Sequence, residues 1–310
     1  MVPHTGPVFA TIGLFPDLKS MTIFTGSPDE RITHDMFNKN VFTSAQNGYM
    51  RQHMTAYAFA EKYPDITTWT GCIPDVAAGR DGWAALVRAL KDEYPKVAKL
   101  EPKFIDPQVA KAGNTDFKSQ ISQLSTTSAE GFWTSEYGSD GITFYQQARQ
   151  FGLPKHFKAM GDYGADIFLP IALKRDVPPN VWSTMYWYYG AFPDNPHTKE
   201  VMAAAKALGN PYSSGFTVLG HLGIMAYAMA IKETGSSDIE KVGSYLEGGT
   251  WETLNGTGHF RKEDHQIIAK QNLVHWQPTD EEPGWKAGEF ITVDDNDVVP
   301  PPNPGKKWED

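Results

Sequence analysis

The alternation of apolar and polar positions predicts a chain in which buried strands and amphipathic helices follow one another. The clearest example begins with Phe132-Trp133-Thr134, which is aromatic and β-branched, as in a buried strand. Ile142, Tyr145 and Arg149 then recur at helical spacing, and the polar loop 135–141 lies between the two elements. Because open α/β sheets bind ligands at the carboxyl ends of their strands, this loop is a candidate site.

The same alternation recurs along most of the chain. Strand-like runs are expected at 19–24, 41–43, 66–72, 103–106, 157–160 and 181–187, and helical faces at 48–61, 83–90, 117–124, 167–171, 202–208, 214–234 and 239–246. Such alternation implies βαβ units and a mostly parallel sheet. A length of 310 residues exceeds what one hydrophobic core usually serves, so we predict two α/β lobes.

The last part of the chain has a different pattern. Segments 258–261 and 272–276 are predicted to form a late hairpin. From Pro278 onward the chain is acidic and rich in proline, and it ends in VVPPPNPGKKWED. This composition predicts a mostly irregular tail at 278–310.

Composition excludes several classes of partner. The net charge is −9 and there is no basic block, so neither a nucleic-acid groove nor an anionic membrane surface is expected as a partner. Cys72 is the only cysteine, so no internal disulfide can form. The amino end lacks the pattern of a signal peptide, and no run approaches the roughly 18 apolar residues of a membrane span. Either the protein is cytoplasmic, or its export signal is absent from this chain.

Several motifs, taken in order, resemble one known family along nearly the whole chain. They are Asn114-Thr115-Asp116-Phe117 before a helix, the strand, polar loop and helix ending at Phe144–Leu153, the long helix 215–235 followed by Ser236-Ser237-Asp238, and Gly256–Phe260 with Asp264-His265-Gln266. Together they resemble the type I periplasmic substrate-binding proteins of the branched-chain amino acid, leucine-binding-like type, which feed ABC importers. The resemblance implies two Rossmann-like lobes with mostly parallel sheets, the periplasmic binding protein-like I fold.

The resemblance also implies where the lobes divide and what is missing. Family members carry a strand, a long helix and a second strand and helix before the segment that Val2–Phe9 resembles. The first lobe is therefore expected to be incomplete, through truncation or a misplaced start, with the export or lipoprotein signal ahead of the missing quarter. The family's three crossings predict lobe 1 at 1–43 and 188–255, and lobe 2 at 44–187 and 256–277. The full-length protein would be periplasmic or lipid-anchored at the cell surface.

The family's ligand contacts map onto nine positions. An amino acid needs donors for its carboxylate and an acceptor for its ammonium. The resemblance assigns contacts with the ligand to nine residues. They are Thr5, Gly6, Thr25, Gly26 and Ser27 in the first lobe, and Ala78, Tyr137, Asp162 and Tyr163 in the second. Each has a plainer interpretation as a turn residue, a surface tyrosine or, for Asp162, a helix cap.

Two positions depart from the family pattern. Tyr163 stands where the family places its acidic amine anchor, and Asp162 lies one position away. Ala78 stands where an aromatic residue is common. These changes leave room for a bulkier or uncharged ligand, such as an amide, a urea derivative or an aromatic acid. The aromatic run 185–189 could line such a pocket, or could pack in the core and hinge.

The enzyme alternatives rest on isolated residues. Cys72 at the end of an apolar strand is typical of a small buried hydrophobe. His259, His265 and His275 fit no standard metal-ligand spacing, and no P-loop, dinucleotide fingerprint or nucleophile elbow is present. We therefore expect no turnover, no metal and no cofactor.

The prediction is a monomeric solute-binding component of an ABC importer that binds a small polar ligand between its lobes and docks on a membrane permease. A cytoplasmic ligand sensor and an α/β enzyme of the same architecture stay as alternatives.

Overall fold

The computed structural model describes residues 5–15, 17 and 20–308, which form two compact units. Of the described residues, those within 1–51, 186–271 and 292–310 form unit 1, and those within 52–185 and 272–291 form unit 2. The chain has a mixed α/β fold with a largely parallel central sheet, as the sequence predicts.

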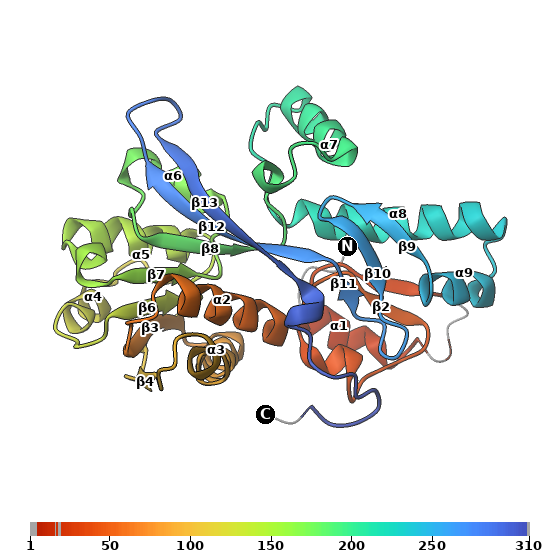
Figure 1. Cartoon of the computed structure of the whole chain (residues 1–310), viewed down its shortest axis with the longest axis horizontal. Helices are drawn as coiled ribbons and strands as arrows, with labels where there is room; N and C mark the ends of the chain where they lie inside the picture. The colour runs from red at the N-terminus through yellow and green to blue at the C-terminus, as the bar shows by residue number, and fades with distance from the viewer. Residues whose placement is uncertain (1–4, 16, 18–19, 309–310) are drawn as a thin grey trace. The chain divides into compact units, whose positions relative to one another are not determined.

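An eight-stranded sheet forms the centre of unit 2 (Figure 1). Seven of its strands follow the order β13-β12-β8-β7-β6-β3-β4, and β5 pairs with β3. The strands from β4 to β8 run parallel, whereas β12 is antiparallel to β8. Their bounds are β3 Thr68–Pro74, β4 Lys103–Phe104, β5 Gln108–Ala110, β6 Gly131–Thr134, β7 Ala159–Asp162, β8 Val181–Met185, β12 Lys270–Pro278 and β13 Trp285–Asp294.

Helices cover both faces of this sheet. They are α2 Gly48–Lys62, α3 Ala77–Val97, α4 Lys118–Leu124, α5 Ser139–Gln150 and α6 Phe168–Leu173, with short 3-10 turns η2 Leu153–His156 and η3 Lys174–Asp176. Phe59 of α2 stacks on Trp69 of β3, with ring centroids 5.3 Å apart. Phe144 of α5 stacks on Phe132 of β6 at 5.5 Å. Since Trp69 pairs with Gly131 and side chains alternate along a strand, Trp69 and Phe132 point to opposite faces. Thus α2 and α5 pack on opposite sides.

Unit 1 contains a short parallel pair of strands and a three-stranded antiparallel sheet. Strand β1 (Thr22–Phe24) pairs with β2 (Val41–Thr43), and β10 (Gly256–Phe260) pairs with both β9 (Thr250–Thr253) and β11 (Ile267–Ile268). An isolated bridge between Thr43 and Gln266 joins the two groups of strands. The carboxyl ends of β1 and β2 therefore lie at the same edge, because the two strands are parallel and in register from Thr22–Val41 to Phe24–Thr43.

The helices of unit 1 pack against these strands through apolar faces. They are α1 Thr5–Ile12, α7 Pro196–Ala207, α8 Thr217–Thr234 and α9 Ile239–Leu246, with 3-10 turns η1 Glu30–Thr33, η4 Tyr189–Ala191 and η5 Asp295–Asp297. Leu222 and Ala226 of α8 share one core cluster with Leu246 of α9, Phe42 of β2 and Phe260 of β10. The helices predicted at 202–208, 214–234 and 239–246 are therefore confirmed as α7, α8 and α9.

The borders of the units differ from the predicted crossings. The chain passes from unit 1 to unit 2 after Arg51 rather than after Thr43, and residues 256–271 belong to unit 1. The reason is packing: Phe260 and Ile267 lie in the core cluster of Phe42 and Trp251. Strand β10 accordingly pairs with β9, and the hairpin predicted between 258–261 and 272–276 is wrong because β12 pairs with β8.

The segment predicted as an irregular tail is largely ordered. Residues 285–294 form β13, and Val293 and Val298 are buried. The predicted strand at 19–24 is confirmed only for Thr22–Phe24, and Lys19 lies outside the described residues.

Candidate functional site

A row of polar side chains crosses the carboxyl ends of four parallel strands in unit 2. Cys72 of β3 pairs with Thr134 of β6, Thr134 with Asp162 of β7, and Asp162 with Ser183 of β8. Paired residues of parallel strands point to the same face, which here is the face covered by α5, and all four residues are completely buried. The row lies where open α/β sheets bind ligands.

Asp162 is held by several donors within this row. Ser183 donates its hydroxyl to Asp162 Oδ2 at 2.8 Å, and the backbone N–H of Ala165 lies 3.2 and 3.3 Å from the two carboxyl oxygens. Trp276 Nε1 in turn donates to Ser183 Oγ at 2.9 Å. Burial raises the pKa of Asp162 to about 7, against the hydrogen bonds that lower it. These bonds match the helix-cap interpretation, so the assignment of Asp162 to the ligand stays a prediction.

Glu136 is the acid in this region that sequence reasoning did not single out. It lies in the loop after β6 and is fully buried, yet its Oε2 atom has no hydrogen-bond partner within the described chain. Its Oε1 atom accepts from the weak thiol donor of Cys72, with Sγ 3.8 Å away. Burial, with the nearby charge of Asp140, raises the pKa of Glu136 to about 7. The available signal was a single glutamate in a polar loop after a buried strand.

Two glycines pack closely against the backbone of Glu136. A Cβ atom at either Gly141 or Gly164 would lie 2.6 Å from the carbonyl oxygen of Glu136, so no larger residue fits without a shift. Thr134 Oγ1 accepts the backbone N–H of Glu136 at 3.1 Å and donates to Cys72 O at 2.7 Å. The loop is thereby anchored to β3, to the start of α5 and to the segment after β7.

The other predicted residues of unit 2 follow the same strand ends. Tyr137 is 61% exposed and immediately follows Glu136. Tyr163 is half-buried after β7, and its ring centroid lies 5.6 Å from that of Trp133. Ala78 is exposed in the first turn of α3, which follows β3. Since β3, β6 and β7 are adjacent, the structure brings Ala78, Tyr137 and Tyr163 to one edge of the sheet.

This edge is predominantly acidic. Asp140 accepts the backbone N–H of Gly113 at 2.6 Å, and Arg80 pairs with Asp75 at the start of α3. The groups that shift the pKa of Glu136, other than burial, are Asp140 and Cys72, and no Lys or Arg from the described ranges is among them. A cation or a hydrogen-bond donor brought here would meet an uncompensated carboxyl group.

In unit 1, two polar loops follow the parallel strands β1 and β2. Ser27 is buried, and the Oγ1 atom of Thr25 is buried without a hydrogen-bond partner in the part of the chain that is described. Gly26 lies between them in the same loop. Ser44, after β2, donates to Phe24 O at 3.3 Å and to Leu219 O at 3.1 Å. The predicted loop 25–27 thus lies beside the polar loop after β2.

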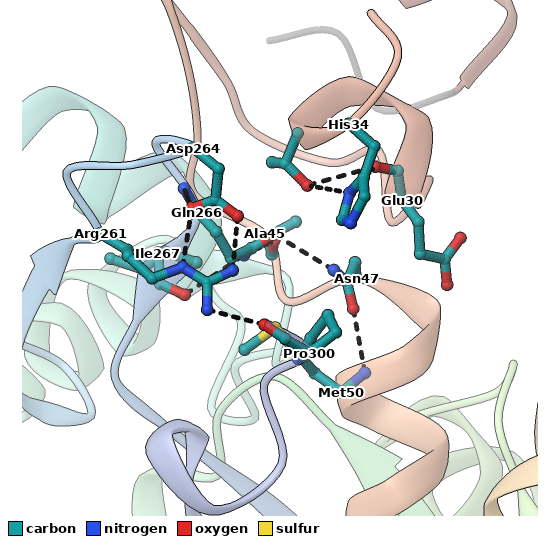
Figure 2. A network of polar contacts seen from close by, with 11 residues as sticks. Glu30, His34, Ala45, Asn47, Met50, Arg261, Asp264, Gln266, Ile267 and Pro300 are labelled. Atoms are coloured by element: carbon teal, nitrogen blue, oxygen red, sulfur yellow. Dashed lines mark hydrogen bonds and ion pairs between the residues drawn. The ribbon is translucent and has the colours of Figure 1, made fainter. Parts of the chain in front are cut away.

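A polar network holds the loop after β2 in place (Figure 2). Gln266 donates its side-chain amide to Ala45 O at 2.9 Å, and Asn47 caps α2 by accepting the backbone N–H of Met50 at 3.0 Å. Figure 2 also shows Arg261 between Asp264 and the carbonyl oxygen of Pro300, to which it donates at 2.7 Å. This part of unit 1 is fixed largely by side-chain hydrogen bonds.

Thr5 and Gly6 do not lie in a loop as expected. They are the first residues of α1, whose apolar residues Val8 and Ile12 pack against Phe24. The spacing of these apolar positions favours a helix, which the loop prediction overlooked. The side chain of Thr5 lies outside what the structure describes.

The candidate metal ligands are not grouped. The described ranges contain no cluster of three or more His, Cys, Asp or Glu residues suited to a metal ion. His265 instead contacts Val41 O at 2.9 Å and Glu247 at 3.3 Å, and His275 contacts Pro179 O at 2.7 Å.

Burial raises the pKa of the Cys72 thiol well above its usual value, which disfavours the reactive thiolate. Within the described ranges, no helix is both long and apolar enough to cross a membrane.

Comparison with known proteins identifies the family. The model of the periplasmic binding protein family matches residues 3–282, and the chain belongs to this family. A curated relative from Pseudomonas aeruginosa, the leucine-, isoleucine-, valine-, threonine- and alanine-binding protein, is 26% identical over 223 residues. That alignment covers 72% of this chain and 56% of the relative, so the chain matches little more than half of the relative's length.

Solved structures share the fold at low identity. A branched-chain amino acid ABC transporter periplasmic ligand-binding protein from Burkholderia xenovorans superposes with a TM-score of 0.80 at 21% identity, covering 97% of this chain and 78% of that one. An ABC transporter solute-binding protein from Rhodopseudomonas palustris, in complex with 3,4-dihydroxybenzoic acid, gives 0.75 at 18% identity, covering 94% and 77%. The neighbours therefore include binders of chemically different ligands.

Proposed function

We propose that this chain is the solute-binding component of an ABC importer and binds a small polar ligand. The observation that carries the proposal is the strand-end site of unit 2 in a chain of the periplasmic binding protein family. There Glu136 offers a buried carboxyl oxygen, without a partner among the described residues, beside the exposed Tyr137. Buried polar groups without partners are rare and costly, and a ligand is one way to satisfy them.

The finer parts of the proposal follow the sequence prediction. Thr25, Gly26 and Ser27 of unit 1, with Ala78, Tyr137, Asp162 and Tyr163 of unit 2, are proposed ligand contacts. The ligand is an amino acid, an amide or a related organic acid. The partner is a membrane permease, and the place of action is the periplasm or the cell surface. The solute-binding protein is proposed to act as a monomer without turnover. A cytoplasmic sensor would use the same site, and no contact in the structure favours it.

Thermal unfolding against a panel of amino acids, amides and aromatic acids tests the proposal. A ligand that binds only the folded state adds about 2.7 kcal/mol of stability at a hundredfold excess over its Kd. We expect at least one class in the panel to raise the melting temperature in proportion to the logarithm of its concentration. Chemical turnover of a stabilising compound would instead favour the enzyme alternative. A folded protein that no member of the panel stabilises would contradict the proposal.

A further inference from the structure

Glu136 raises a question that the fold alone does not answer. A fully buried carboxyl group normally has a cation or several hydrogen-bond donors as partners. Glu136 has a weak thiol contact at Oε1 and, within the described ranges, no partner at Oε2. Asp162, at the end of the neighbouring strand β7, accepts bonds from Ser183 and Ala165. Of these two buried acids, Glu136 is the one whose hydrogen-bonding capacity is unused.

The position of Glu136 is fixed by its surroundings rather than left to a mobile loop. Its carbonyl oxygen occupies the space that a Cβ atom at Gly141 or Gly164 would need, and its N–H is held by Thr134. The backbone of Glu136 is therefore held in place and its side chain is fully buried, and a group that selects a ligand requires such a fixed support. The titratable groups that face it are Cys72 of β3 and Asp140 of α5, while the segment after β7 presents Gly164.

The charges around Glu136 determine which ligand group would suit it. Cys72 is kept as a neutral thiol and Asp140 is negative, so a second anion would be repelled. A positive group would gain a charge-assisted hydrogen bond to Oε2 in a place shielded from water. We propose that Glu136 is a specificity-determining residue that binds the ammonium group of a ligand at the site of the proposed function and releases a proton to solvent as it does so.

The proton balance follows from the pKa of the free site. With its pKa raised by burial to about 7, Glu136 holds a proton on part of the molecules at neutral pH. A bound ammonium group favours the carboxylate, so the carboxyl proton leaves to buffer and the ion pair remains. Binding at pH 7 should therefore release a fraction of a proton per ligand. Affinity should fall as pH is lowered from 8 to 6, because the ionised fraction of Glu136 falls over this range.

The test is calorimetry on the full chain with probes that differ only in the ammonium group. The pairs are L-leucine with 4-methylpentanoate, and L-phenylalanine with 3-phenylpropanoate. Titrations in two buffers of different ionisation enthalpy give the number of protons released. Glu136→Gln keeps the shape of the side chain and removes its charge. Asp140→Asn is the matched control, since it removes a neighbouring charge and leaves the carboxyl of Glu136 in place.

We expect the wild type to prefer the ammonium-bearing member of the pair that binds. Glu136→Gln should lower that affinity at least tenfold and remove the part of the proton release that Glu136 contributes. Asp140→Asn should retain proton release, shifted to lower pH.

Unchanged affinity and pH profile in Glu136→Gln would overturn the inference and leave a buried acid hydrated by water. Equal or tighter binding of the nitrogen-free probes would overturn it while leaving the proposed function intact. If a folded wild type binds neither these probes nor the panel above, the proposed function fails together with the inference.

Discussion

Gln46 donates its side-chain amide to Asp295 at 2.9 Å, across 249 positions of the sequence. Asp295 also accepts the backbone N–H of Ala269 and the side-chain amide of Gln271, each at 3.0 Å. One buried carboxylate thus joins three separate segments of unit 1. The segment around Asp295 is therefore an integral part of this unit.

The buried Asp295 predicts a pH dependence of stability. Burial raises its pKa from 3.8 to about 7 in the folded state. Between these values the folded protein holds a proton that the unfolded chain has released, so the contribution is full below about pH 4 and is lost as pH rises through 7. A shift of this size corresponds to a loss on the order of 4 kcal/mol.

The variant Asp295→Asn isolates this group from the other buried acids. Urea unfolding at pH 4, 5.5, 7 and 8 should show the variant gaining stability relative to wild type as pH rises. The Gln271 amide, whose oxygen has no partner among the described residues, can rotate to accept from the new Asn side chain. A difference between the two proteins that does not change with pH would contradict the assignment.

The pair of Arg261 and Asp264 predicts a non-additive effect. Arg261 contacts both oxygens of the buried Asp264 and also Pro300 O. Arg261→Met leaves the carboxylate buried without its cation, which typically costs about 3–5 kcal/mol. Arg261→Met with Asp264→Leu should recover most of that loss. Denaturant unfolding of the two single variants and the double variant measures the coupling, and strictly additive losses would show that the pair is not coupled.

The close approach of Gly164 to Glu136 predicts a packing effect. A Cβ atom at residue 164 would lie 2.6 Å from Glu136 O, so Gly164→Ala should cost about 1–3 kcal/mol by forcing the loop to move. Gly248→Ala is the matched control, since nothing lies within 4 Å of its added methyl group. Chemical unfolding should show the control near neutral or slightly stabilised. Equal effects at both positions would contradict the tight packing of the loop.

The parallel sheet of unit 2 could be predicted from the sequence because its signals are local. A short apolar run, a polar loop and an amphipathic helix recur in order, and the structure confirms this at β6 and α5. The placement of Tyr137 at a strand end follows from the same pattern. The fold class needed no information about distant contacts.

What could not be predicted depends on contacts between distant segments. The segment 285–294 reads as polar and acidic, and its pairing with β12 makes it a strand. Residues 256–271 join unit 1 through the packing of Phe260 on Phe42, which no local pattern encodes. Glu136 was missed for a similar reason, because its burial depends on the close approach of Gly141 and Gly164.

The central claim is that a ligand binds at the strand ends of unit 2, and Tyr137 offers the most direct test. Phe151 is the matched control, because it is also an exposed aromatic residue, at 56%, but lies at the other end of α5. Calorimetry with the best ligand of the panel should show Tyr137→Ala weakening binding by about 2 kcal/mol or more, since buried aromatic area is lost from the complex. Phe151→Ala should bind as the wild type does. If Tyr137→Ala also binds as tightly as the wild type, the ligand is held elsewhere and the account of this site is wrong.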